Sequence, residues 1–262
     1  MSRTYCLIAV VAVMLVLAVP VQAEYTARVL GMGNTALAVG NDSAAWFNNP
    51  ALLPDLAADG LLAPWPNRIS VGAEVGGDFH DLAINFSSRD AAGNRGWGVG
   101  FESMGGGTDS FGSGYGQTCS FVDGLNWGVS GVSVDDGIDD EFLFSIALAY
   151  DVPMPVSKLV VAAEVWDVTD RFDTQINLGA AYYLPMDLTL ALDVYDVDDA
   201  SVVNFGGEYA GPGLGEFIVR AGVADGDLTV GVGRDFGPVE LSVGWIDAGG
   251  DDFIFATGEA SL

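Results

Sequence analysis

The chain has 262 residues, of which 50% are apolar, and its 9 basic and 36 acidic residues give a formal net charge of −27. A protein this acidic repels phosphate backbones, which excludes a nucleic-acid-binding function. The mean hydropathy of +0.35 is high for so charged a chain, yet no apolar run after residue 23 approaches the roughly 18 residues of a membrane-spanning helix. Because only helices and closed β-barrels satisfy their backbone groups in lipid, this distribution favours a barrel.

Residues 1–23 have the order of a secretory signal peptide. Arg3 precedes an apolar run from Leu7 to Val19, and small residues close the segment at Ala23. The run is too short for a transmembrane helix, so we predict cleavage after Ala23 rather than an uncleaved anchor. Cleavage removes Cys6 and leaves Cys119 without a partner, which excludes an intramolecular disulfide and a cysteine metal site.

Residues 24–66 show no strand-like alternation and are predicted to form a plug or hatch. Asp42 and Ser43 stand where a helix would start, and Pro50 limits that helix to one or two turns. A compact aromatic segment joined to a barrel with a wide lumen is expected to lie inside it. The candidate plug residues are Gly31, Gly33, Asp42, Trp46, Phe47, Asn49, Pro50 and Ala51.

Residues 67–262 alternate with a period of two. In the clearest segment Leu188, Leu190 and Leu192 interleave with Thr189 and Asp193, and side chains two apart share one face of a strand. We predict an all-β, antiparallel, up-and-down transmembrane barrel of about 12 strands, within a range of about 10–14. A soluble β-sandwich also alternates, but charged and small residues on the second face favour the barrel.

The polar faces also predict which charged side chains line the lumen. The candidates are Glu74, Glu102, Glu164, Asp193, Glu208, Glu216, Arg220 and Glu240. This excess of carboxylates disfavours an anionic solute unless Arg220 receives its headgroup, whereas a neutral hydrophobe or a cation is tolerated better. Alternatively, the carboxylates only keep the lumen hydrated.

Two stretches resemble the FadL-like superfamily of outer-membrane proteins. Leu30-Gly31-Met32-Gly33 and the triplet Asn49-Pro50-Ala51 are similar to the start of its PorV/PorQ-like branch and of the related conjugal-transfer TraF-like branch. Residues 203–247 are similar to its run of a Gly-Glu-Tyr strand, an Arg-Ala-Gly strand, a glycine-alternating strand and a final hairpin.

The resemblance implies a location in the bacterial outer membrane, in contact with its lipid, and assembly by the barrel-assembly machinery. It also implies one of two functions. The first is the binding or passage of a small hydrophobic or neutral solute through a plugged lumen. The second is a barrel that does not transport and serves as an anchor or shuttle for a secretion-system protein.

Three other motifs were weighed. Gly31, Gly33 and Ala36 match a dinucleotide fingerprint, but no strand precedes them, so no cofactor is expected. The acidic turn 135–141 lacks EF-hand spacing and is interpreted as a solvated loop, with calcium binding left open. His80 is the only histidine, and Cys119 has no second histidine to act as a base. No catalytic site is therefore predicted, and the chain is not expected to be an enzyme.

Overall fold

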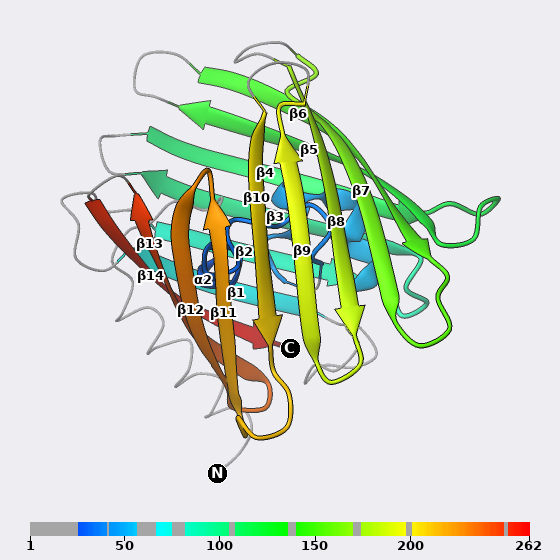
Figure 1. The fold of residues 1–262 in the computed structure, drawn as a ribbon. Helices are drawn as coiled ribbons and strands as arrows, with labels where there is room; N and C mark the ends of the chain where they lie inside the picture. Colours follow the sequence, from blue (N-terminus) through cyan, green and yellow to red (C-terminus); the bar gives the residue numbers. More distant parts are fainter. Residues whose placement is uncertain are drawn as a thin grey trace.

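The computed structural model is a closed barrel of antiparallel strands with short helices inside it (Figure 1). It describes residues 26–40, 42–56, 67–74, 82–104, 108–135, 140–169, 174–197, 201–248 and 251–262. The predicted signal peptide, His80 and most of the acidic turn 135–141 lie outside these residues.

Each strand of the barrel pairs with its neighbours in the sequence, and the last strand pairs with the first to close the sheet. The strands are β1 (Asn67–Glu74), β2 (Leu82–Arg89), β3 (Arg95–Met104), β4 (Thr108–Thr118), β5 (Leu125–Asp135), β6 (Asp140–Val152), β7 (Lys158–Trp166), β8 (Gln175–Leu184), β9 (Leu188–Tyr195), β10 (Val202–Tyr209), β11 (Phe217–Ala224), β12 (Asp227–Asp235), β13 (Val239–Ala248) and β14 (Asp251–Ser261).

The described residues contain 14 strands, so the predicted number of about 12 was too low. One strand that the alternation did not reveal is β4. Its inward positions include Gly112 and Gly114 and also Ser110, and they alternate with polar and aromatic residues. The contrast between an apolar and a polar face is therefore weak in β4, although the backbone pairs fully with β3 and β5.

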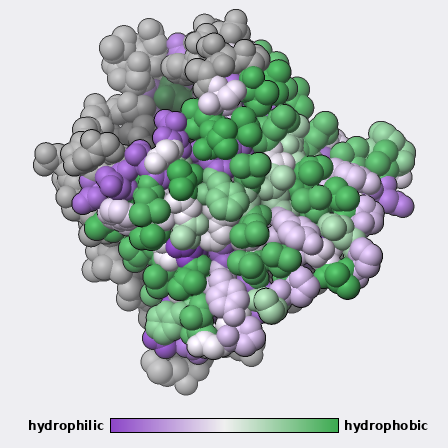
Figure 2. Space-filling view, in the orientation of Figure 1, coloured by the Kyte–Doolittle hydropathy of each residue, from purple (hydrophilic) through white to green (hydrophobic). Residues whose placement is uncertain are grey.

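The two faces of the barrel wall differ as predicted. On β9, Leu190 and Leu192 point outward, whereas Thr189 and Asp193 are buried inside. Figure 2 shows hydrophobic residues spread over the outer surface of the strands. No described helix is long and apolar enough to cross a bilayer. With apolar groups outside and polar groups inside, the wall has the distribution expected of a barrel in lipid.

Three short helices lie inside the barrel (Figure 1): α2 (Ala27–Gly31), α3 (Ala45–Asn48) and the 3-10 helix η1 (Pro50–Asp55). α2 packs mainly on β11 to β14, and α3 with η1 packs mainly on β2 to β6. α3 is a single turn that ends two residues before Pro50, the first residue of η1. We call residues 26–40 and 42–56 together the plug.

Candidate functional site

The first half of the plug is attached to the wall by an ionic cluster. Arg28 in α2 donates to both carboxylate oxygens of Glu208, each at 3.0 Å. Arg220 donates at 2.7 Å to Glu208 and at 2.7 Å to Glu240, and its side chain is 0% exposed. Charge-assisted, bidentate hydrogen bonds of this kind are stronger than neutral ones. Two carboxylates of the wall thus hold two guanidinium groups, one of which belongs to the plug.

Asp42 extends this polar region towards β1 and β14. Its Oδ1 accepts a hydrogen bond from the Ala44 N–H at 3.0 Å, while its buried Oδ2 accepts none. Burial, and next the Glu259 carboxylate, raises the pKa of Asp42 to about 6. Burial disfavours the charge of Arg28. The nearby carboxylates of Glu208 and Asp42 nevertheless raise the pKa of Arg28 above its ordinary value, so the side chain remains charged.

The segment after α2 is fixed through its backbone N–H groups. The Asp193 Oδ2 atom accepts from the Ala36 N–H at 2.7 Å and from the Leu37 N–H at 2.9 Å. Thr229 accepts from the Gly33 N–H at 2.9 Å. Gly33 has φ +71°, and a Cβ at this position would overlap the carbonyl oxygen of Phe205. The wall therefore requires glycine at this position of the predicted motif.

The second half of the plug is held mainly by shape. The indole of Trp46 is buried, and its Nε1 donates to Asn85 Oδ1 at 3.0 Å. Glycines on the inner faces of β3 and β4 surround this ring: a Cβ at Gly112 would come within 2.6 Å of it, and a Cβ at Gly100 would overlap it. These glycines leave the space that the indole fills.

The other predicted plug residues lie close to Trp46. Phe47 meets the Trp46 ring edge to face, with 5.6 Å between the ring centroids. Asn49 is fully buried and donates from Nδ2 to the Leu37 carbonyl at 2.6 Å, while its Oδ1 accepts from the Ala51 N–H at 3.0 Å. Pro50 begins η1. Asn49 thus joins the two halves of the plug to each other.

Seven of the eight predicted lumen residues lie on the inner side of the barrel: Glu74, Glu102, Glu164, Asp193, Glu208, Arg220 and Glu240. The structure places the eighth, Glu216, elsewhere. Glu216 lies in the turn before β11, where its side chain is 62% exposed and pairs with Arg234 at 3.0 Å. The alternation was extended one residue beyond the strand, into a turn where it no longer reports a face.

Two important residues of the site, Arg28 and Glu259, were not predicted. Arg28 bears the charge that binds the plug to Glu208, and Glu259 accepts from both Arg68 at 2.7 Å and the Ser43 N–H at 2.9 Å. Glu259 lies two residues after Thr257 in β14. The alternation of side chains along a strand could therefore have placed it on the inner face. Arg28 lies outside the strands, and only its place among so few basic residues could have drawn notice.

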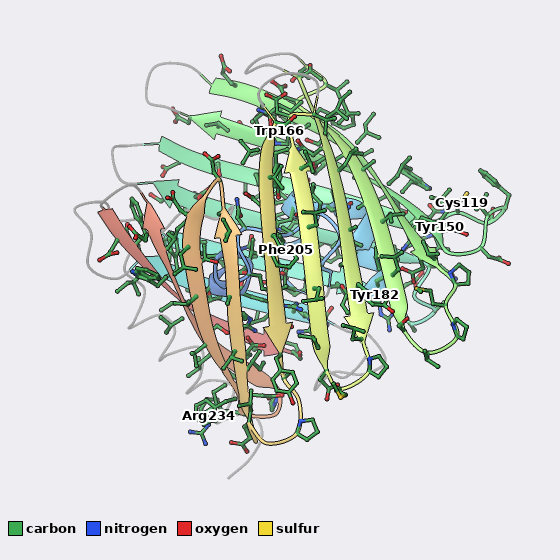
Figure 3. All side chains as sticks on the ribbon, viewed as in Figure 1. Cys119, Tyr150, Trp166, Tyr182, Phe205 and Arg234 are labelled. Carbon is green, nitrogen blue, oxygen red and sulfur yellow. The ribbon has the colours of Figure 1, made fainter. Side chains whose placement is uncertain are left out.

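The plug separates two cavities. One, of about 340 Å³, lies at the rim where β7 and β9 end and β8 and β10 begin. Another, of about 150 Å³, lies at the opposite rim, beside Arg28, Asp42 and Glu259. Figure 3 labels Trp166 at the top of the barrel, at the first rim, and Arg234 near the bottom. Between the cavities, Met32, Leu37 and Leu52 of the plug pack on inward alanines of β6 to β9.

Other chemistry finds little support in the part of the chain that the structure describes. No group of three or more His, Cys, Asp and Glu side chains there is arranged to hold a metal ion. Cys119 is a buried free thiol. The polar interior is instead rich in hydrogen-bonding carboxyl, amide and hydroxyl groups.

No family model and no curated protein matches the sequence. Among solved structures, the chain is similar to the toluene transporter TodX of Pseudomonas putida, with a TM-score of 0.58 and 14% identity over 93% of this chain and 99% of that one. For a deltaS2 mutant of the TodX monoaromatic hydrocarbon channel the TM-score is 0.57 and the identity is 13%, over 91% of this chain and 98% of that one. The likeness establishes the barrel fold that the FadL-like resemblance implies, and it does not distinguish the PorV/PorQ-like or TraF-like branch.

Proposed function

We propose that the chain is an outer-membrane barrel that binds a small solute and lets it pass when the plug moves. The apolar exterior and polar interior of the wall support a membrane location. The fold that the chain shares with TodX, described as a toluene transporter, supports passage of a small molecule. The observation that carries the proposal is the position of the plug between two cavities of one lumen.

The charges of the lumen favour some solutes over others. Carboxylates such as Glu208, Glu240 and Glu259 are matched by Arg28, Arg68 and Arg220 at one rim. Towards the other rim Glu164 and Asp193 form no ion pair with a described residue. Among the described residues, no arginine or lysine lines the cavity at that rim, so an anion entering there finds no partner of opposite charge. The proposed solute is therefore neutral or cationic.

A disulfide between the plug and the wall tests whether the plug must move. Ser43 Oγ in the plug lies 2.6 Å from Ser70 Oγ in β1, so Ser43→Cys with Ser70→Cys places two sulfur atoms near bonding distance. Cys119→Ala removes the native thiol. In liposomes, we expect oxidation to lower solute flux by about tenfold and reduction to restore it, because the bond holds the plug in the lumen.

Each single-cysteine variant is the matched control, and its flux should not respond to oxidation. A disulfide that forms quantitatively and leaves the flux unchanged would contradict passage by displacement of the plug. Flux that is absent in both redox states, in a barrel with normal heat-modifiable gel mobility, would favour the second function.

That second function is a non-transporting barrel that anchors or hands on a secretion-system protein. Exposed apolar residues at the short turns favour it. Phe121, between β4 and β5, is 86% exposed, and Val156, between β6 and β7, is 78% exposed. Large apolar side chains outside the strands suit contact with a protein or with the edge of the membrane. Replacing both by serine should abolish co-purification of a partner only if this function is correct.

A further inference from the structure

The larger cavity, of about 340 Å³, has a mixed aromatic and polar lining. Phe47 and Asn48 of the plug form one side of it, and Glu164, Trp166 and Tyr195 of the wall form another. Because these wall residues lie near the ends of β7 and β9, the cavity is at the mouth of the lumen, outside the apolar seal of the plug. Its size is within the range of small-molecule sites.

Glu164 brings an unsatisfied polar atom to this cavity. The residue is 4% exposed, its Oε2 accepts from Asn177 Nδ2 at 3.2 Å, and its Oε1 accepts no hydrogen bond. Asp193, in β9 on the far side of β8, is 0% exposed, and its Oδ1 likewise accepts none, but it does not line the cavity. A buried carboxyl oxygen without a donor costs free energy. Glu164 therefore favours a ligand that brings a hydrogen-bond donor.

The other lining residues indicate the rest of the ligand. Phe47, Trp166 and Tyr195 offer aromatic surface, which attracts both apolar groups and cations. The buried Nδ2 of Asn48 also has no acceptor. A hard metal cation is a poor fit, because it prefers several charged oxygen ligands and Glu164 is the one acidic residue among the described residues that line this cavity. A carboxylate ligand is a poor fit because no described arginine or lysine lines the cavity to hold it.

We propose that this cavity binds a small organic cation. Its ammonium group donates to the free oxygen of Glu164, and its apolar body lies among Phe47, Trp166 and Tyr195. The inference rests on the proposed function, because it identifies the cavity as the place where the solute first meets the plugged lumen and names the class of that solute. In the part of the chain that the structure describes, no basic side chain lines the cavity to repel such a cation.

Three probes of similar shape test the proposal on the full-length protein in non-ionic detergent: 2-phenylethylammonium, 2-phenylethanol and 3-phenylpropionate. Calorimetric titration should show saturable binding of the cation, binding of the alcohol weaker by about tenfold, and no binding of the anion. Glu164→Gln keeps the shape of the side chain. It should weaken binding of the cation by about tenfold and leave the affinity for the alcohol unchanged.

Glu216→Gln is the matched control, since it removes the same charge from an exposed turn outside the lumen. Heat-modifiable gel mobility reports whether each variant is folded. If Glu164→Gln does not fold, Trp166→Ala tests the aromatic side of the cavity and should also weaken binding of the cation. Equal affinity for the cation and the alcohol, or cation binding that neither variant changes, would overturn the proposal.

The proposal and the proposed function can fail separately. Cation binding by a barrel whose flux does not respond to the Ser43–Ser70 disulfide would keep the site and overturn the gated passage. Redox-controlled flux of phenylethanol in a protein that does not bind the cation would do the opposite.

Discussion

The two halves of the plug are held in the same lumen by different forces. Around α2, an ion pair joins the plug to the wall, and Arg28 shares Glu208 with the fully buried Arg220. Around α3 and η1, the contacts are mainly those of an aromatic and an apolar surface with glycines of the wall, centred on Trp46. Glycines also allow α2 to approach the wall, and Leu30 packs there with Ala73 and Phe255, but the charged contact of α2 is the Arg28–Glu208 ion pair.

This difference has a consequence for movement. When a charged side chain of the plug leaves its partner beside a cavity, water can replace the lost polar contacts, so the net free-energy cost of separation is moderate. An indole that leaves a close-fitting space leaves a void, and its lost contacts have no replacement. We therefore expect displacement of the plug to begin at α2, and passage to require that the α3–η1 half, which acts as the anchor, is released as well.

Trp46→Ala should have the largest effect on the anchor. Truncation of a buried tryptophan costs about 3–5 kcal/mol, and here it also leaves Asn85 Oδ1 without its donor. Urea unfolding of the detergent-solubilised barrel should show this loss, and flux should rise because the anchor is weakened. High salt should not change the effect, since no charge is involved.

Trp97→Ala is the matched control, because Trp97 is exposed on the outer face of β3 and contacts Phe86 instead of the plug. Its flux should equal that of the wild type. Equal effects of the two substitutions on flux would show that the indole inside the lumen does not anchor the plug.

Arg220→Met should have a smaller effect, of about 3 kcal/mol, at the low end for loss of one member of a buried ion pair. The reason is that Arg28 still neutralises Glu208, so only Glu240 loses its cation. Adding Glu240→Gln should recover much of the unfolding free energy. No such rescue is expected for Trp46→Ala, and a failure of rescue at Arg220 would contradict the ionic description of this half.

The wall of the barrel could largely be predicted from the sequence, because each strand carries its own signal. The residues of β9 that point in and out follow from a period of two that is a local property of the backbone. The limits of that signal are also local. β4 was missed because glycine has no hydropathy contrast with serine, and Glu216 was misplaced because β11 begins one residue later, at Phe217.

The contacts of the plug could not be predicted in the same way. The pairing of Trp46 with Gly100 and Gly112, or of Arg28 with Glu208, joins positions that are far apart in the sequence. Such pairs depend on how the strands are registered and on where the barrel closes, which no local pattern encodes. Glycines on the inner face of a strand indicate that another group lies close to the backbone there. Which residue occupies that space is set by the tertiary fold.

The smallest effect concerns Asp42, which lies between the two halves. Burial and the Glu259 carboxylate raise the pKa of Asp42 from 3.8 to about 6. The charge of Arg28, the hydrogen bond from the Ala44 N–H and the charge of Arg68 act in the opposite direction and lower it. Between these two pH values the folded protein binds more protons than the unfolded chain, so the free energy of unfolding should fall as the pH rises from 3.8 to about 6. Asp42→Asn keeps an oxygen to accept from Ala44 and removes the titration, so this part of the pH dependence should disappear. Urea unfolding at intervals across this range measures it, with the exposed Asp123→Asn as control. If both variants kept the slope of the wild type, the pH dependence would come from another group, and Asp42 would not link the plug to its ionic cluster.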